Sequence, residues 1–282
     1  MKIALVYNPK LAAKRLGRVN ALAEVLERAG HSLTHFAAES FEAVRDAADM
    51  DSVVIAGGDG TARLVIANQS DLAALPPVAV YPIGTINLLA RELRYPRDPA
   101  KFVARIMNEE AHTISRLATI NGKPFLACAS VGFDAQTVAV VSEDVKLRIG
   151  RFAYVTAMLS LVTDWPRRQF TLDCDGRRFE AEALFVLRGR FYAGPWSLDP
   201  QAALHHEKLR ALALPRAGRR DVARLLTYAV TGSRMPHGKW NFIEADAIKV
   251  VCADDQAVQA DGDILLRGPA TFDLTDDAVT FL

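Results

Sequence analysis

The five residues Gly57-Gly58-Asp59-Gly60-Thr61 combine a flexible backbone with polar side chains, directly after an apolar run at 53–56. The run predicts a buried strand, and the spacing of apolar residues at 62–69 predicts a helix after the glycines. Three glycines in four positions permit a tight turn and a close approach to a ligand, while the start of a helix presents unpaired N–H groups to an anion. We expect this loop to hold the phosphates of a nucleotide, with Mg²⁺ bound by Asp59. The alternative is a strand-to-helix turn without a ligand.

A second strand, loop and helix follow in the same order. Residues 78–81 are strand-like, Pro82-Ile83-Gly84-Thr85-Ile86-Asn87 forms the loop, and 88–93 has helical spacing. In open α/β sheets, ligands bind outside the carboxyl ends of the strands. We therefore expect Gly84, Thr85 and Asn87 to reach the same phosphates, or the ribose, as the first loop.

The N-terminus supplies a third unit of this kind. Residues 3–7 are strand-like, and Asn8-Pro9 ends this strand before a helix rich in alanine, leucine and arginine. Asn8 is therefore expected to face the same crevice as the two loops.

Together, these residues resemble the diacylglycerol kinase catalytic-domain family, which includes bacterial lipid kinases, sphingosine kinases and ceramide kinases. The resemblance runs nearly end to end. It continues through Gly132-Phe133-Asp134-Ala135, Tyr192-Ala193-Gly194-Pro195, Asp199-Pro200-Gln201-Ala202 and Gln259-Ala260-Asp261-Gly262-Asp263. A GGDGT sequence also occurs in NAD kinases, so the second loop and its helix discriminate between the two families. The resemblance implies phosphoryl transfer from ATP to a lipid hydroxyl, in a nucleotide domain joined to a β-sandwich.

The last of these motifs stands where the resemblance places an acidic proton acceptor. Relatives carry glutamate there, whereas this chain has Asp263, with Asp261 two residues earlier. Residues two apart on a strand point to the same face, so either carboxylate is a candidate base if the segment is extended. The alternative is a solvated acidic hairpin turn. Because phosphoryl transfer also needs a metal to offset charge, Asp59 is a third candidate catalytic residue.

Composition is that of an ordinary soluble enzyme: 282 residues, half of them hydrophobic, with a formal net charge of +1. Near-neutral charge argues against a nucleic-acid partner. The three cysteines, Cys128, Cys174 and Cys252, are far apart and odd in number, which predicts neither a disulfide framework nor a metal cluster and fits a reducing cytoplasm. The apolar run at 3–7 is too short for a signal peptide, and no stretch is long enough to span a bilayer. We expect any membrane contact to be peripheral, at the inner face.

The pattern of elements changes after residue 108, where alternating strands and helices give way to short strand-like runs with turn signals. We place an α/β nucleotide-binding domain, of the type shared by NAD kinases and diacylglycerol kinases, at 1–117. An antiparallel β-sandwich that binds the lipid acceptor is placed at 118–274. Residues 275–282 are expected to return to the first domain.

Within the second domain, turn residues predict individual hairpins. Asp175-Gly176 separates strand-like runs at 170–174 and 179–187, an arrangement typical of a β-hairpin. A further strand is expected at 125–129.

Some segments depart from the family pattern or stay open. Arg63 follows the first loop where many relatives have asparagine, and we hypothesise that it contacts a phosphate. His205-His206-Glu207 stands where some bacterial relatives bind a structural Mg²⁺ through an acidic pair; that ion is not assumed here, and we expect the histidines to face solvent.

The apolar run at 152–165, which has basic flanks, either covers a sheet or lines an acyl-chain cleft. Trp196 either packs internally or anchors at an interface.

We interpret the chain as an ATP- and Mg²⁺-dependent lipid kinase with diacylglycerol as the leading acceptor. Sphingoid bases and ceramide are alternative acceptors. A nucleotide-binding regulatory protein with little turnover is the alternative of another class, suggested by Asp263 and the altered loops, while NAD kinase is disfavoured by the second loop. The expected partners are the lipid acceptor and a membrane surface; a homodimer stays open.

Overall fold

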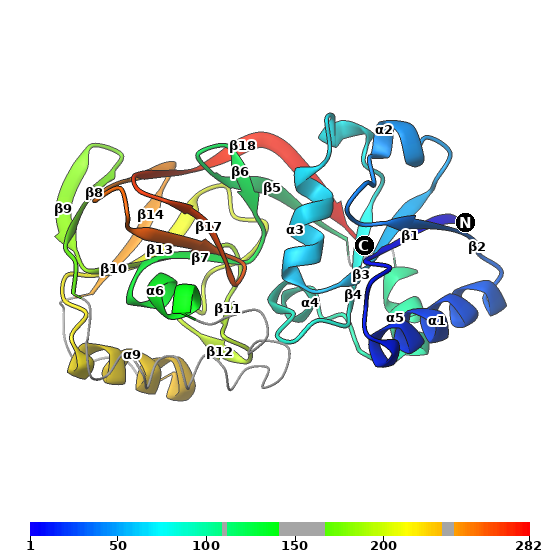
Figure 1. Ribbon diagram of the computed structural model, residues 1–282, viewed down its shortest axis with the longest axis horizontal. Coiled ribbons are helices and arrows are strands. Elements are labelled where there is room, and N and C mark those ends of the chain that lie inside the picture. Colours follow the sequence, from blue (N-terminus) through cyan, green and yellow to red (C-terminus); the bar gives the residue numbers. More distant parts are fainter. Residues whose placement is uncertain (109–111, 141–166, 233–239) are drawn as a thin grey trace. The chain divides into compact units, whose positions relative to one another are not determined.

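The computed structural model describes residues 1–108, 112–140, 167–232 and 240–282. The chain divides into two compact units: unit 1 comprises Met1–Leu117 and Thr275–Leu282, and unit 2 comprises Ala118–Leu274. Figure 1 shows the elements of both, and each unit is described by itself below. The apolar run predicted at 152–165 lies outside the described residues.

Unit 1 is built on a parallel sheet with helices on both faces (Figure 1). Its elements are β1 (Lys2–Tyr7), α1 (Ala13–Arg28), β2 (Ser32–Ala37), α2 (Ala43–Asp46), β3 (Ser52–Gly57), α3 (Asp59–Ala67), a 3₁₀ turn (Leu72–Ala74), β4 (Val78–Pro82), α4 (Leu88–Glu92), α5 (Pro99–Ile106) and β5 (Thr113–Ile120). The strands lie in the order β2, β1, β3, β4 and are parallel. Every residue of β3 and β4 is buried, as in strands covered on both faces.

The end of the chain completes this sheet. The last strand, β18 (Ala270–Phe281), aligns Phe281 with Val78 at the start of β4, and the Leu282 N–H donates to the Val78 carbonyl at 2.9 Å. Val279 and Phe281 are buried, so these residues add apolar surface to the core of unit 1.

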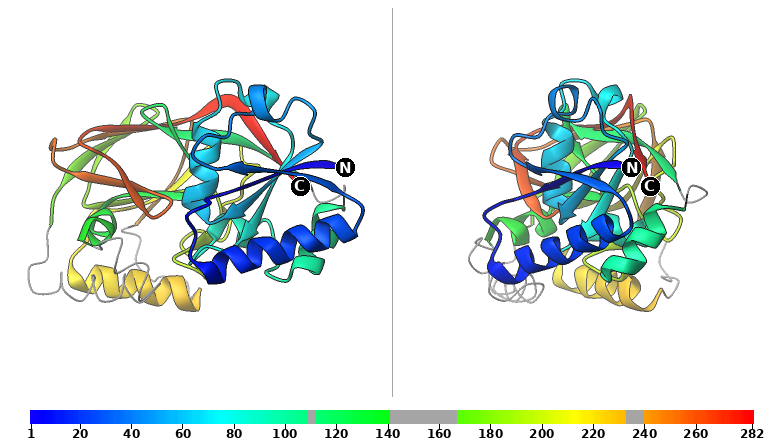
Figure 2. Two further views of the ribbon diagram at one scale, coloured as in Figure 1. Left: turned by 45° about the vertical axis from the view of Figure 1, so that its right-hand side comes forward. Right: turned by 90° about the vertical axis from the view of Figure 1, so that its right-hand side faces the viewer.

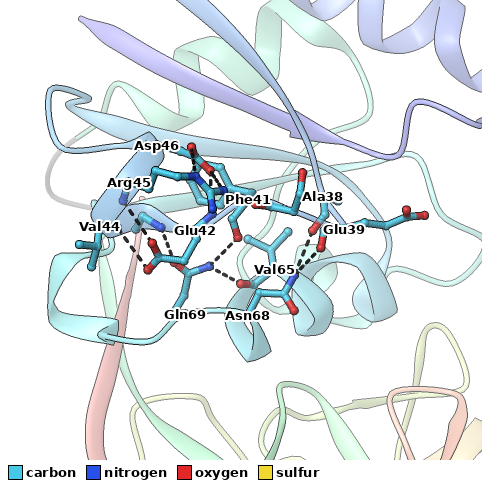
Figure 3. Close-up of polar contacts among 12 residues, drawn as sticks. Ala38, Glu39, Phe41, Glu42, Val44, Arg45, Asp46, Val65, Asn68 and Gln69 are labelled. Atoms are coloured by element: carbon cyan, nitrogen blue, oxygen red, sulfur yellow. Dashed lines mark hydrogen bonds and ion pairs between the residues drawn. The ribbon is translucent and has the colours of Figure 1, made fainter.

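Polar side chains fix the C-terminal end of α3 against the segment that follows β2 (Figure 3). The Gln69 side chain accepts the Ala43 N–H at 2.8 Å and donates to the Phe41 carbonyl at 3.4 Å. The Asn68 amide donates to the Glu39 carbonyl at 3.1 Å. Because the far end of α3 is held this way, its first turn keeps a fixed position at the end of β3.

Unit 2 is an antiparallel sandwich. Its elements are β6 (Lys123–Phe125), β7 (Cys128–Gly132), α6 (Phe133–Val140), β8 (Phe170–Cys174), β9 (Arg177–Ala181), β10 (Ala183–Leu187), β11 (Phe191–Tyr192), β12 (Trp196–Ser197), β13 (Leu209–Leu214), α9 (Arg219–Thr231), β14 (Asn241–Ala245), β15 (Ala247–Val251), β16 (Ala257–Ala260) and β17 (Asp263–Arg267). One sheet has the order β14, β13, β10, β7, β16, β17; the other contains β18, β15, β8 and β9. A shared core includes Leu172 and Phe272 from one sheet and Leu184 and Val258 from the other. The predicted fold class is confirmed.

Two predicted strands are wrong in extent. Residues 179–187 do not form one strand, because β9 ends at Ala181 and β10 begins at Ala183 in the other sheet. The Glu182 side chain at this crossing accepts hydrogen bonds from Arg167 at 2.6 Å and from the Ala217 N–H at 2.7 Å. The strand predicted at 125–129 is likewise divided, between β6 and β7. The hairpin at Asp175-Gly176 is confirmed by the antiparallel pairing of β8 with β9.

Candidate active site

The two glycine loops of unit 1 touch each other. β3 and β4 are aligned so that Gly57 lies beside Pro82, and the Ile83 N–H donates to the Gly57 carbonyl at 3.1 Å. A Cβ atom added to Gly84 would lie 2.6 Å from the Cα of Gly58. The loops therefore depend on glycine because their backbones pack directly against each other.

The helix after the first loop begins earlier than predicted, so that Asp59, Gly60 and Thr61 form the first turn of α3. Gly58 is extended, with φ −108° and ψ −172°, and occupies the cap position. An acidic residue in a first turn is favourable beside the positive end of the helix.

Asp59 connects the first loop to the second. Its side chain is buried, and its two oxygens accept the backbone N–H groups of Leu88 and Leu89, both at 2.9 Å. Burial raises the pKa of the Asp59 carboxyl, although these backbone hydrogen bonds act in the opposite direction. The carboxylate thus binds two N–H groups at the start of α4 and holds the second loop in place.

Asn87 presents a buried acceptor beside both glycine loops. It has a left-handed backbone with φ 56°, and its amide nitrogen donates to the Gly84 carbonyl at 2.8 Å. Its Oδ1 is buried and has no hydrogen-bond partner among the described residues. Because a buried polar atom without a partner is costly, this oxygen is suited to a donor or cation supplied by a ligand.

The remaining predicted residues of unit 1 lie at the carboxyl ends of the same parallel strands. Asn8 follows β1, and its Oδ1 accepts the Lys10 N–H at 2.8 Å. Thr61 and Arg63 are half-buried on α3, whereas Thr85 is exposed in the second loop. Their contacts with a nucleotide stay predictions.

Sequence reasoning missed one cation at this edge. The Arg18 guanidinium donates to the Pro82 carbonyl at 2.8 Å and lies 5.8 Å from the centroid of the Tyr81 ring. It therefore supports the strand end from which the second loop leaves. No local motif marks Arg18, because its partner is 64 residues away in the sequence.

In unit 2, the predicted acidic pair is divided between a turn and a strand. Asp261 has a left-handed backbone with φ 51° in the turn between β16 and β17, and Asp263 begins β17. The Asp261 oxygens accept the N–H groups of Leu126, Ala127 and Cys128 at 2.9, 2.8 and 3.2 Å. Of the two conformations considered for this segment, the structure has a hairpin turn, so the two carboxylates do not lie on one face of an extended strand. Asp263 is half-buried.

Asp134, which stands in the glycine–aspartate motif at 132–135 and is not among the predicted site residues, connects to this hairpin. It lies in the first turn of α6 and accepts hydrogen bonds from Ser130 Oγ at 2.5 Å, from the Tyr192 hydroxyl and from Gln259 Nε2 at 3.3 Å. Gln259 Oε1 in turn accepts the Gly262 N–H at 3.1 Å. Burial raises the pKa of the Asp134 carboxyl, with the hydrogen bonds opposing it. The available signal was an aspartate inside a glycine-containing motif directly after a strand.

The histidine pair lies in a turn before β13. The rings of His205 and His206 contact each other edge to face, with centroids 5.0 Å apart. His205 is exposed and His206 is half-buried; burial, followed by the charge of His205, lowers the pKa of His206. Across the described ranges, no group of three or more His, Cys, Asp or Glu side chains is arranged to hold a metal ion.

Comparisons with known proteins cover both units. Residues 2–118 match the diacylglycerol kinase catalytic domain, and residues 127–282 match the YegS C-terminal NAD kinase beta sandwich-like domain. A diacylglycerol kinase of Staphylococcus carnosus is 26% identical over 282 residues, covering 95% of this chain and 90% of its own. One of Bacillus subtilis is 25% identical over 272 residues, covering 92% and 88%. A crystal structure of a diacylglycerol kinase from Bacillus anthracis shares the fold, with a TM-score of 0.70 at 19% identity and coverage of 99% and 96%.

The match to the diacylglycerol kinase catalytic domain, together with curated relatives named diacylglycerol kinase, places the chain among the lipid-kinase phosphotransferases. The chain belongs to the diacylglycerol kinase catalytic-domain family, as its sequence motifs predicted. Within the described residues, no helix is long and apolar enough to cross a membrane.

Proposed function

We propose that this lipid kinase transfers the γ-phosphate of ATP to a hydroxyl group of diacylglycerol and forms phosphatidic acid. The observation that carries the proposal is the contact between the glycine loops at Gly58 and Gly84, beside the buried Oδ1 of Asn87. The names of the curated relatives support diacylglycerol as the acceptor. Because this acceptor resides in membranes and ATP in the cytoplasm, the enzyme works as a peripheral protein at the inner membrane face.

The nucleotide is held by unit 1. The backbone of Gly57, Gly58, Gly60 and Thr61 binds its phosphates, as a glycine loop before a helix does in other nucleotide sites. Asn8, Gly84, Thr85 and Asn87 complete the cradle from the neighbouring strand ends. ATP supplies the phosphoryl group, and Mg²⁺ offsets the charge of the phosphates.

Asp59 has two roles in this proposal. Its two oxygens accept the Leu88 and Leu89 N–H groups, and carboxylate oxygens are also ligands that a magnesium ion prefers. The same side chain holds the second loop against the first, through its hydrogen bonds to Leu88 and Leu89. Removing it is therefore expected to weaken both the loop and the metal site.

Asp263 is the proposed proton acceptor of unit 2. As the acceptor oxygen forms its bond to the γ-phosphorus, its proton passes to the Asp263 carboxylate, and the bond from phosphorus to the β-bridging oxygen breaks to release ADP. Asp261 already accepts three backbone N–H groups, so we assign it to positioning this hairpin.

The test is a transfer assay with labelled ATP, Mg²⁺ and mixed micelles that contain diacylglycerol, ceramide, sphingosine or monoacylglycerol. Asp263→Asn is expected to abolish product while ATP still binds. Asp261→Asn is expected to lower the free energy of unfolding by about 1–3 kcal/mol, because charge-assisted hydrogen bonds at a partly buried turn are lost. The matched control is Asp254→Asn, which changes an exposed carboxylate in another turn of the sandwich and is expected to leave both readouts unchanged.

Each alternative gives a different pattern in this assay. If only ceramide or only sphingosine became labelled, that lipid and not diacylglycerol would be the acceptor. ATP binding without any labelled lipid would support a regulatory protein. Full activity of Asp263→Asn would contradict its role as the base.

A further inference from the structure

A fully buried arginine lies inside unit 2. Arg188 directly follows β10, is 1% exposed, and is the largest of the fully buried side chains in the described ranges. β10 lies between β13 and β7 in its sheet (Figures 1 and 2), and the Arg188 N–H donates to the Ala127 carbonyl at 2.9 Å. Because a guanidinium group cannot lose its charge in a protein, its burial requires acceptors within the fold.

The acceptors are backbone carbonyls of the segment at 199–208, which connects β12 to β13. Arg188 Nη2 donates to the Leu204 carbonyl at 2.7 Å, and Nη1 donates to the His206 carbonyl at 3.2 Å. Backbone carbonyls are also among the oxygen ligands that proteins offer to hard divalent cations. In this segment, a guanidinium of the chain itself binds them.

The buried carboxylate of the same segment is paired in a similar way. Asp199 is buried; one of its oxygens accepts a hydrogen bond from Arg210 Nε at 2.7 Å, and the other accepts the Gln201 N–H at 3.0 Å. Arg210 Nη2 also donates to the Gln201 side chain at 3.0 Å. Carbonyl and carboxylate oxygens of the segment are thus bonded to two arginines.

The donors of this segment do not fit a structural Mg²⁺. Some bacterial relatives bind that ion through an acidic pair, where this chain has His205-His206-Glu207. Mg²⁺ prefers oxygen ligands, and imidazole nitrogens suit other metals. Burial and the positive charges of His205 and the two arginines lower the pKa of His206, with Glu244 opposing them. The same burial and the same charges disfavour a divalent cation there.

We propose that Arg188 supplies this segment with its internal cation, so that the segment needs no structural Mg²⁺. The guanidinium directs N–H groups at two carbonyls, whereas Mg²⁺ demands a nearly octahedral set of oxygens. Because the arginine is part of the chain, a chelator cannot remove it. Any Mg²⁺ requirement of the transfer then belongs to the nucleotide, a consequence that rests on the proposed function.

The first experiment compares amide hydrogen exchange of the full chain in millimolar MgCl₂ and in excess EDTA, without nucleotide. Exchange at 199–208 and in β13 is expected to be the same in both solutions. The readout is local, so it separates this segment from Mg²⁺ bound at Asp59, which lies in unit 1. Slower exchange in MgCl₂ that is confined to 199–208 and β13 would overturn the inference.

The second experiment removes the guanidinium. Arg188→Met is expected to speed exchange at 199–208 about ten- to hundredfold, because charge-assisted hydrogen bonds to two carbonyls are lost. Arg188→Lys keeps a cation and is expected to lose less protection. The matched control is Arg177→Met, which removes an exposed arginine of β9 and should exchange like the wild type. Wild-type exchange in Arg188→Met would show that the guanidinium does not hold the segment.

The comparison of MgCl₂ with EDTA uses the wild type alone, so it decides the question even if Arg188→Met does not fold. Neither experiment involves ATP or lipid. Equal exchange in both solutions, in a chain that transfers no phosphate, would overturn the proposed function and leave the inference standing. Protection of the segment by Mg²⁺ would overturn the inference, while transfer to diacylglycerol would still support the proposed function.

Discussion

The contact between Gly58 and Gly84 leaves no room for a side chain. Gly84→Ala would place a Cβ 2.6 Å from the Gly58 Cα and 2.6 Å from the Asn87 Oδ1, so a loop must move. We expect a loss of about 1–3 kcal/mol in the free energy of unfolding, together with a large loss of ATP affinity. Urea unfolding and titration calorimetry measure the two effects.

The matched control is Gly17→Ala in the interior of α1. An added Cβ there meets no atom within 4 Å, so the substitution is expected to stabilise the helix by about 0.5–1 kcal/mol without changing ATP affinity. Equal ATP affinity in Gly84→Ala and the wild type would show that the loops need not touch to bind the nucleotide.

Residues in local patterns were predictable, and residues with distant partners were not. The glycines, Asp59 and Asn87 stand directly after apolar runs, and the resulting strands and helices place them together. Arg18 and Asp134 have the partners Pro82 and Gln259, which are 64 and 125 residues away, and no spacing in the sequence reveals such pairs. The sequence leaves the conformation of Asp261 open between a strand and a hairpin turn, because alternation alone does not distinguish the two.

The start of α6 holds a half-buried carboxylate, Asp134, whose titration is linked to folding. Burial raises the pKa of Asp134 above its value in the unfolded chain, so the native state binds more protons in the interval between the two values. Stability contributed by the protonated form is present below the unfolded pKa of about 4 and is lost as the pH rises through the folded pKa. Asp134→Asn removes this titration and keeps a side chain of the same shape.

We therefore expect Asp134→Asn to lose less stability than the wild type as the pH rises from about 4 to about 7, by at most about 1.4 kcal/mol per pH unit. Urea unfolding at several pH values measures the difference in slope. Asp254→Asn, an exposed carboxylate, controls for the loss of one negative charge. Parallel curves for Asp134→Asn and the wild type would contradict a raised pKa at this position.

Element types were predictable to the extent that their patterns are local. The central strands β3 and β4 of unit 1 are largely apolar and buried, and the Asp175-Gly176 turn marks its hairpin. The crossing at Glu182 is not visible in the sequence, because 179–187 contains no glycine or proline to mark a break; in the structure Glu182 binds Arg167 and the Ala217 N–H there. The helix α3 begins at Asp59 and not at residue 62 as predicted. Glycines usually argue against a helix, but Asp59 stabilises this first turn.

Unit 1 is incomplete without residues from the far end of the chain. Phe281 is buried beside β4, and the Tyr95 hydroxyl donates a hydrogen bond to the carbonyl of Leu282, 187 residues later. The nucleotide-binding unit can therefore reach its final packing only after the residues of unit 2 have been synthesised. Loss of the Phe281 ring should leave a cavity under β4, at the strand that carries the second glycine loop.

Phe281→Ala is expected to destabilise unit 1 by about 3–5 kcal/mol, the usual cost of removing a buried phenylalanine ring. The control is Ile114→Ala, because Ile114 is 64% exposed on β5 and its truncation should cost no more than about 0.5 kcal/mol. Hydrogen exchange of the β1, β3 and β4 amides measures unit 1 directly, whereas fluorescence reports unit 2, whose residue range includes all three tryptophans. Faster exchange in unit 1 should be accompanied by weaker ATP binding, since β3 and β4 carry both glycine loops. Unchanged exchange in these strands would show that Phe281 contributes nothing to the nucleotide-binding unit.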